Sequence, residues 1–292
     1  MKISAVVAIK DERETPLKTL QSLRDFADEI VVADIGMSQD MLKQIKAIKN
    51  VRILTYPTPS YIELFRQKII DESHGTWVLY IDPDEILTKD LQAYIKTHMS
   101  DCDYFTIPRK NIILGHWMQH SRWWPDYQVR FFKKGFVKWG THIHTQPEIK
   151  GREHLVPAVE SLALEHHNYQ TYDQYLEKSY RYAKAEAKNL PDLTLMHALQ
   201  KGLSEFISRY FKDEGYKDGM HGFVMAFSQL VYYFQVYVYV WEGRKYRSAE
   251  EHIEKVPAQF FSRALYETLH WMEVKKIDGK NLFLYLWMKL SK

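Results

Sequence analysis

The 292-residue sequence predicts an α/β fold, with helices flanking a sheet, followed by a helical C-terminal region. Two patterns predict this class. Short apolar runs typical of buried strands alternate four times with amphipathic segments in about the first eighty residues. After residue 172 apolar residues recur at helical spacing instead. The composition, 46% hydrophobic and 26% charged, is that of a folded globular protein.

The first run, 3–9, is apolar almost throughout, as expected of a strand buried on both faces. Pro16 suits the first turn of a helix, where its missing N–H has no helical partner. Because parallel strands need crossover connections, the alternation indicates a doubly wound sheet that is parallel at least in this half. Further strands are expected at 29–33, 51–54 and 77–81, and helices at 16–23, 41–48 and 62–73.

Three acidic residues, Asp82, Asp84 and Glu85, follow the apolar run 77–81. Carboxylates at the carboxyl end of a strand point into the crevice where open α/β sheets bind ligands. Two aspartates one residue apart can share Mg²⁺ or Mn²⁺ and leave positions for phosphate oxygens. The alternative is an ordinary turn and helix start, in which Asp84 or Thr88 caps the next helix.

The turn after the second strand is another candidate binding element. Asp34 is placed to hydrogen-bond a base or ribose, while Gly36 and Ser38 allow the backbone to approach a ligand closely. In the alternative interpretation, Asp34 caps a helix in a tight turn.

Charge and cysteine content restrict the function. The net charge of +3 arises within 201–292, which holds 14 Lys and Arg against 11 Asp and Glu. This mild excess favours an anionic surface as partner and argues against nucleic acid. Cys102 is the single cysteine, so an internal disulfide is excluded and a reducing compartment is indicated. Because 1–9 begins a strand and lacks a signal-peptide pattern, we expect a cytoplasmic location.

Three segments together resemble family 2 glycosyltransferases: 6–12 (VVAIKDE), 27–40 (ADEIVVADIGMSQD) and 75–85 (GTWVLYIDPDE). The similarity covers roughly residues 3–145, and small bacterial enzymes of lipopolysaccharide-core and surface-polysaccharide synthesis are the most similar. That family has the GT-A fold, a Rossmann-like mixed sheet flanked by helices, with a nucleotide-sugar donor and an Asp-x-Asp metal site, and it inverts the anomeric centre. The resemblance therefore implies a UDP-sugar donor and Mn²⁺ or Mg²⁺ as cofactor.

The resemblance also implies roles for individual residues. The nucleotide would be held by Ile9, Asp11, Asp34, Gly36, Asp82 and Arg130, the last by neutralising diphosphate charge. The metal ligands would be Asp82, Asp84 and His166, or His167 in place of His166. Helix capping or packing is the alternative for these histidines, and a zinc site with Glu165 matches no recognised spacing.

Two departures from the family pattern concern the nucleotide. The second motif usually reads DSGSTD, whereas 34–40 reads DIGMSQD, and Asp11 stands where the family usually has Asn. Both changes bear on which nucleotide is preferred more than on the fold.

An inverting transfer needs a base that takes the proton of the acceptor hydroxyl. Asp126 is the first candidate, because 125–131 (PDYQVRF) resembles a family segment on the acceptor side of the cleft. Glu148 is the second, since many relatives have a His-Glu pair near this point. His142 and His144 alternate on a predicted strand and either contact phosphate or metal or are structural.

Four tryptophans lie within 117–139, in the second half of the catalytic region. Aromatic faces suit sugar rings, so Trp123 and Trp124, beside charged neighbours, are candidates for acceptor contact. For Trp117 and Trp139 a place in the core is an equal alternative.

The segment 223–241 has nineteen residues without a charge, four of them Tyr, and Arg244, Lys245 and Arg247 follow it. As a helix it would be about 28 Å long, near the thickness of a bilayer core. Its polar and aromatic content favours the membrane surface over a span. A buried helix or a homodimer contact through the C-terminal helices is the alternative.

The predicted organisation is a GT-A catalytic domain at 1–170 and a helical region at 171–292. The nucleotide-binding half would occupy about 1–100 and the acceptor half about 101–170. The predicted function is a metal-dependent inverting glycosyltransferase of cell-surface polysaccharide synthesis, acting on a glycan or lipid-linked acceptor, peripheral on the inner membrane face. The alternatives are a metal-dependent nucleotidyltransferase and a non-catalytic membrane-associated assembly protein.

Overall fold

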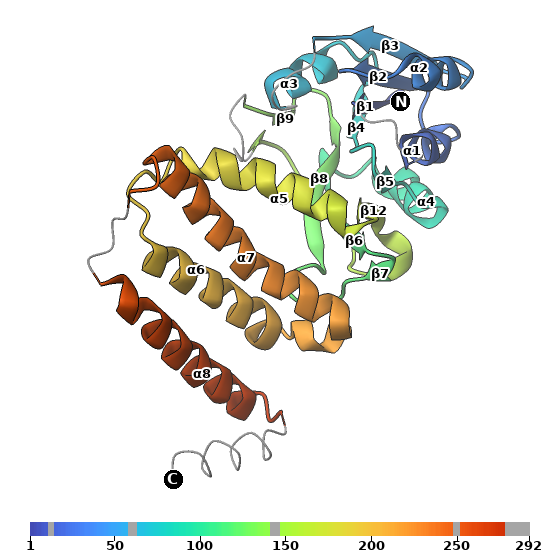
Figure 1. Ribbon diagram of the computed structural model, residues 1–292. Coiled ribbons are helices and arrows are strands. Elements are labelled where there is room, and N and C mark those ends of the chain that lie inside the picture. The colour runs from blue at the N-terminus through green and yellow to red at the C-terminus, as the bar shows by residue number, and fades with distance from the viewer. Residues whose placement is uncertain (11–14, 58–62, 141–146, 248–251, 278–292) are drawn as a thin grey trace. The chain divides into compact units, whose positions relative to one another are not determined.

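The computed structural model describes residues 1–10, 15–57, 63–140, 147–247 and 252–277 (Figure 1). The chain forms two compact units. Unit 1 comprises 1–112 and 124–168, and unit 2 comprises 113–123 and 169–292. Asp11, His142 and His144, all singled out above, lie outside the described residues.

Unit 1 is built on a mixed sheet with the strand order β3-β2-β1-β4-β8-β6-β12-β5. Its first half is parallel and consists of β1 (Ile3–Ile9), β2 (Glu29–Asp34), β3 (Val51–Thr55) and β4 (Trp77–Tyr80). Its second half is antiparallel where β8 (Asp126–Lys133) pairs with β4 and with β6 (Tyr104–Ile113). The other strands of this sheet in unit 1 are β5 (Glu85–Ile86), β11 (Glu153–Leu155) and β12 (Leu164–Tyr169). A separate two-stranded antiparallel sheet is formed by β9 (Val137–Lys138) and β10 (Glu148–Ile149).

Alternate residues of β1 supply two separate hydrophobic cores, one on each face of the sheet. Ala5 and Val7 belong to one core, and Val6 and Ala8 to the other. Because side chains alternate along a strand and both faces are covered, every residue of β1, β2 and β4 is buried. This double burial explains the continuous apolar runs of the sequence.

Helices cover both faces of the sheet (Figure 1). Leucine, methionine and isoleucine side chains of α1 (Thr15–Leu23), α2 (Gln39–Lys46) and α4 (Lys89–His98) join the first core. Ile69 and Ile70 of α3 (Glu63–Asp71) join the second. Ser38 caps α2 and Thr88 caps α4. The predicted α/β class, a mixed sheet flanked by helices with a helical C-terminal region, is confirmed.

A buried carboxylate joins the amino-terminal ends of neighbouring strands in unit 1. Glu29 accepts hydrogen bonds from Ser4 Oγ (2.6 Å), Arg52 Nε (2.9 Å) and the backbone N–H of His74 (2.9 Å). Burial alone would raise the pKa of Glu29, but these donors and the Arg52 charge lower it from 4.5 to about 2.

We expect Glu29→Gln to lower the free energy of unfolding by about 3 kcal/mol at pH 7. Since the folded-state pKa is depressed, this stability is fully present above the unfolded value of 4.5 and is lost as pH falls towards about 2. Urea unfolding at pH 7 and pH 3 measures the effect. The variant should lose less stability than the parent between these pH values, whereas the exposed-carboxylate control Asp101→Asn should behave like the parent. An unchanged pH dependence in Glu29→Gln would contradict the assignment.

The described residues of unit 2 are mainly helical, and they include the short strand β7 (His116–Trp117). Its α-helices are α5 (Tyr172–Ala187), α6 (Leu195–Ile207), α7 (Gly219–Gly243) and α8 (Val256–Val274). Helix α7 packs against both α5 and α6, and α8 packs against α6. The close approach of α6 to α7 requires Gly202, because a Cβ there would lie 2.9 Å from the carbonyl oxygen of Leu230.

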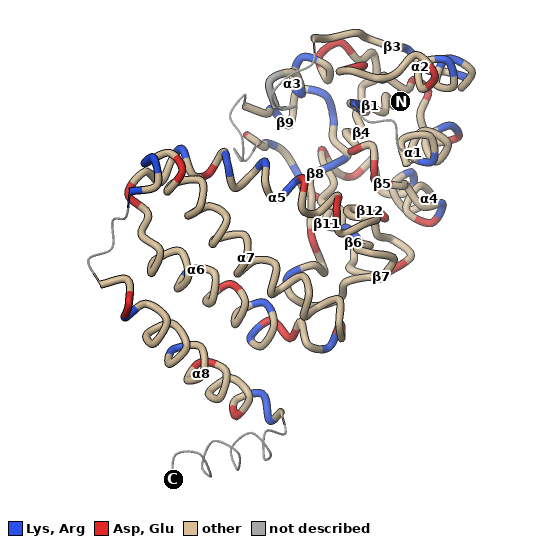
Figure 2. The backbone as a smooth tube through the Cα atoms, in the orientation of Figure 1, with Lys and Arg blue, Asp and Glu red and all other residues tan. Residues whose placement is uncertain are grey.

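The apolar segment 223–241 lies within α7, which carries no Lys, Arg, Asp or Glu along most of its length (Figure 2). Among the described helices, only the stretch 215–243 meets length and composition criteria for crossing a membrane, criteria that core helices of soluble proteins also meet. A third of the residues in its apolar 18-residue segment are buried. The side chains left exposed are mainly Met220, Phe223, Phe227 and Phe234. Membrane association and dimer formation stay predictions.

Candidate active site

The sheet of unit 1 brings several predicted residues to one edge. Ile9 and Asp34 end β1 and β2 and are directly paired in register. The turn after β4 reaches the same edge, because Ile81 donates its backbone N–H to the carbonyl of Val6 in β1 (3.1 Å). Asp82 follows immediately. The carboxyl ends of three adjacent parallel strands therefore define the candidate site, as expected for an open α/β sheet.

Asp34 organises the turn that follows β2. Its Oδ1 accepts hydrogen bonds from the backbone N–H groups of Gly36 (3.0 Å) and Met37 (2.9 Å). The cap of α2 is Ser38, so the helix-capping alternative for Asp34 is wrong. Gly36 has φ of 124°, a conformation that favours glycine. Asp34 Oδ2 has no partner within the described part of the chain, which leaves it open to a ligand.

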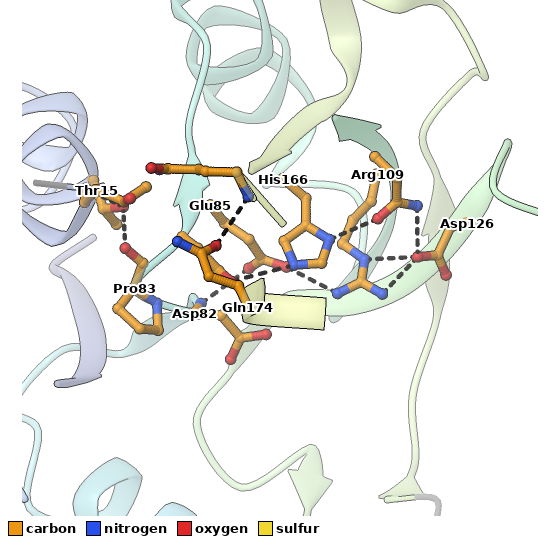
Figure 3. Close-up of polar contacts among 12 residues, drawn as sticks. Thr15, Asp82, Pro83, Glu85, Arg109, Asp126, His166 and Gln174 are labelled. Carbon is orange, nitrogen blue, oxygen red and sulfur yellow. Dashed lines mark hydrogen bonds and ion pairs between the residues drawn. The ribbon is translucent and has the colours of Figure 1, made fainter. Parts of the chain in front are cut away.

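Glu85, the last residue of the acidic turn 82–85, is the centre of a buried ionic cluster (Figure 3). Its side chain is fully buried. Oε1 accepts hydrogen bonds from Arg130 Nη2 (2.6 Å) and Arg109 Nη1 (3.2 Å), and Oε2 accepts one from the backbone N–H of Asp82 (2.9 Å). One carboxylate therefore anchors the acidic turn and two arginines together. This role was not predicted from the sequence, although Glu85 is the third acidic residue of the motif.

Arg130 links the acidic turn to β8. It donates to Asp82 Oδ2 as well as to Glu85. Burial alone would lower the pKa of Arg130, but these two carboxylates raise it, so the guanidinium stays charged. Burial would likewise raise the pKa of Asp82, but Arg130 and Arg109 lower it to about 2. Asp82 is thus a carboxylate with one oxygen fixed by Arg130.

Asp84 and His166 face each other across the turn. His166 Nε2 lies 3.6 Å from Asp84 Oδ2, and His166 Nδ1 lies 2.6 Å from Asn111 Oδ1. An amide oxygen can only accept, so the network assigns the proton to Nδ1. With Nδ1 as the donor to Asn111, Nε2 is the ring atom that faces the Asp84 carboxylate oxygen. A cation or a proton between Nε2 and this oxygen would make their contact favourable.

The Asp84–His166 pair fits a divalent cation. Their separation of 3.6 Å is somewhat longer than the about 3.0 Å between neighbouring ligands of an octahedral ion with bonds of about 2.1 Å, so a small movement of either side chain would bring both onto one ion. Within the described ranges no group of three or more His, Cys, Asp or Glu residues is placed to hold a metal. An ion here would therefore take its remaining ligands from diphosphate oxygens and water, as Mg²⁺ commonly does.

Asp126 is held by several donors at once. Its Oδ2 accepts from Arg109 Nε (2.9 Å), Arg109 Nη2 (2.5 Å) and Asn111 Nδ2 (3.1 Å), and its Oδ1 from Gln128 Nε2 (2.9 Å). Burial raises its pKa, but the Arg109 charge and these hydrogen bonds outweigh burial and lower it. Asp126 therefore has the surroundings of an anchored carboxylate.

The other candidates are placed differently. Glu148 lies exposed in β10, opposite Lys138 of β9. His167 is on the strand face opposite to His166, and burial lowers its pKa. Trp139 packs with Tyr80 and Phe132 in the second core, as its structural interpretation predicted.

Comparison with known proteins identifies the class as glycosyltransferase. A protein of Rickettsia typhi named as an uncharacterized glycosyltransferase is 24% identical over 206 residues, which are 65% of this chain and 68% of that protein. The prophage-derived glycosyltransferase SunS of Bacillus subtilis is 23% identical over 148 residues, which are 50% of this chain and 34% of SunS.

Residues 4–149 match the model of glycosyl transferase family 2, and the chain belongs to that family. The resemblance seen in the three sequence motifs is thereby confirmed. Among solved structures, S. aureus TarS 1–349 in complex with UDP shares 13% identity with a TM-score of 0.45, covering 86% of this chain and 93% of that one.

Proposed function

We propose that this glycosyltransferase moves a sugar, with inversion, from a UDP-sugar to a glycan or lipid-linked acceptor in cell-surface polysaccharide synthesis. The observation that carries the proposal is the Asp84–His166 pair, which stands beside Asp82 at the carboxyl edge of the sheet. Family membership supports a sugar-transfer reaction at this edge.

The nucleoside lies along the ends of β1 and β2 in this proposal. Ile9 and Asp34 are adjacent there, and the open Oδ2 of Asp34 accepts a hydrogen bond from the base or ribose. Gly36 has no side chain to obstruct the ligand. Asp11 was predicted to contribute and keeps that role in the proposal.

The diphosphate lies against the acidic turn. Asp84 and His166 would hold the divalent cation, with diphosphate oxygens and water as its other ligands, and the ion would supply positive charge for the leaving diphosphate. Arg130 and Glu85 fix Asp82 beside this pair, so the acidic turn is formed before the donor binds, and the free oxygen of Asp82 would reach the ion through a bound water. Fixed charges of this kind need little reorganisation during the reaction.

Thermal unfolding with nucleotides and nucleotide sugars, each with Mn²⁺ or EDTA, tests the donor. We expect UDP-sugars with Mn²⁺ to raise the midpoint. A ligand at about 100 times its Kd stabilises the native state by about 2.7 kcal/mol. A shift with nucleoside triphosphates alone, with pyrophosphate release, would support a nucleotidyltransferase instead. The absence of any shift would support a non-catalytic assembly protein.

Asp126 and Glu148 remain the two candidates for the base. A carboxylate with four hydrogen bonds and a lowered pKa takes up a proton less readily, so we assign Asp126 to positioning and Glu148 to proton removal. Glu148→Gln should lower kcat by about 10²- to 10⁴-fold and abolish the acidic limb of the pH profile. Asp126→Asn should lower kcat but keep that limb. The reverse pattern would make Asp126 the base.

We place the protein in the cytoplasm, peripheral on the inner face of the membrane, where a lipid-linked acceptor is accessible. The exposed phenylalanines of α7 and the cations that follow this helix support the placement. Sedimentation with anionic vesicles tests it, and concentration-dependent dimer formation without vesicle binding would indicate a homodimer contact instead.

A further inference from the structure

A groove of about 560 Å³ lies within unit 2, between the carboxyl-terminal parts of α5 and α7. This volume is in the range of small-molecule sites. The two helices pack there through Ala183 and Ala187 against Val236 and Val240. Both helices end at the same end of the unit (Figure 1).

The floor of the groove is mainly aliphatic. It is formed by Ala187, Pro191, Tyr239 and Val240. Ala187 and Val240 are buried, and the small side chain of Ala187 leaves room above it. Gly243, at the end of α7, adds further space, since a Cβ there would meet no atom within 4 Å.

The rim is positively charged. Lys184 and Lys188 are one helical turn apart on α5 and therefore lie on the same face. Neither forms an ion pair with another described residue. Arg244 is the third cation, and Glu242 is the one carboxylate that lines the groove. Three positive charges against one negative charge favour an anionic ligand.

Arg244 is the residue that most specifically indicates a bound ligand, because one of its donors is buried without an acceptor. Its Nε (3.0 Å) and Nη2 (2.5 Å) both donate to the carbonyl oxygen of Pro191, which fixes the plane of the guanidinium. Its Nη1 is buried and has no hydrogen-bond partner in the parts of the chain described. A buried donor without an acceptor is costly, and a ligand oxygen would satisfy it.

We propose that this groove binds a phosphorylated lipid. Its phosphate accepts from Arg244 Nη1 and lies between Lys184 and Lys188, and its hydrocarbon chain lies on the aliphatic floor. A free phosphate would use only the rim and leave the floor exposed, which is why we assign the ligand to a lipid. The inference concerns binding alone and does not depend on the sugar-transfer reaction.

Calorimetric titration of the full chain with dihexanoyl phosphatidic acid below its micelle concentration tests the proposal. We expect this lipid to bind about tenfold or more tightly than inorganic phosphate, and dihexanoyl phosphatidylcholine to bind more weakly than the phosphatidic acid. The double substitution Lys184→Gln and Lys188→Gln should weaken phosphatidic acid binding by about tenfold. Both lysines are exposed, so the variant should fold normally.

Lys255→Gln with Lys276→Gln is the matched control, because it removes two exposed positive charges outside the groove. It should keep the parent affinity and, like the groove variant, the parent unfolding midpoint. No binding of phosphatidic acid by the parent protein would overturn the proposal. Equal affinity for inorganic phosphate would also overturn it, as would an equal loss of affinity in the control.

Discussion

Asp84→Asn should lower kcat/KM by about 10²- to 10³-fold, because it replaces the carboxylate that faces His166 at the proposed metal position with a neutral amide. An amide is neutral and binds Mg²⁺ or Mn²⁺ more weakly than a carboxylate. The fold should be retained, since the Asp84 side chain is about a third exposed. Steady-state kinetics with the UDP-sugar identified by thermal unfolding, at increasing Mn²⁺, measure the loss.

Asp90→Asn provides the control for this change, because Asp90 is an exposed aspartate in the first turn of α4. It should keep the parent activity at every Mn²⁺ concentration. In Asp84→Asn, the Mn²⁺ concentration for half-maximal activity should rise. Full activity of Asp84→Asn at low Mn²⁺ would refute the metal assignment.

Glu85→Gln should lower the free energy of unfolding by about 3–5 kcal/mol, the cost of removing one partner from a buried ion pair. Glu85 is fully buried and accepts from both Arg109 and Arg130. Without its charge, these guanidiniums depend on Asp126 and Asp82 alone. Activity should also fall, because the Asp82 backbone loses its anchor. Urea unfolding and transfer kinetics on the same preparation measure both effects.

Glu160→Gln is the matched control for the Glu85 substitution. Glu160 also pairs with a cation, Lys110 Nζ at 2.6 Å, but its side chain is 57% exposed. Solvent screening makes such pairs worth about 1 kcal/mol or less. A similar small loss in Glu85→Gln would show that the buried cluster is not important for stability.

The antiparallel half of the sheet explains why this cluster was not predicted. Arg109 and Arg130 come from β6 and β8, more than twenty residues from Glu85 in the sequence. Their side chains reach Glu85 only because β8 pairs with both β4 and β6. The register of the β6–β8 pairing shifts between Phe105 and Thr106. Local patterns of hydrophobicity carry no information about such a register.

For the same reason, the sequence could not show which of His166 and His167 lies at the candidate site. Neighbouring residues of a strand point to opposite faces, but the sequence does not state which face holds the site. In β12 His166 is buried and bonded to Asn111, while His167 is less buried and lies near Glu165. Strand pairing therefore places His166, and not His167, beside Asn111 and Asp84.

The strands of the parallel half, the acidic turn at their carboxyl edge and the family could all be predicted from the sequence. These features are local, because a strand buried on both faces must be continuously apolar and a ligand-binding turn must be polar. The tertiary structure alone decided which side chains face one another: Glu85 with Arg109 and Arg130, Asp84 with His166, and α5 with α7 around a basic groove. Such contacts depend on strand register and helix packing, which join residues far apart in the chain.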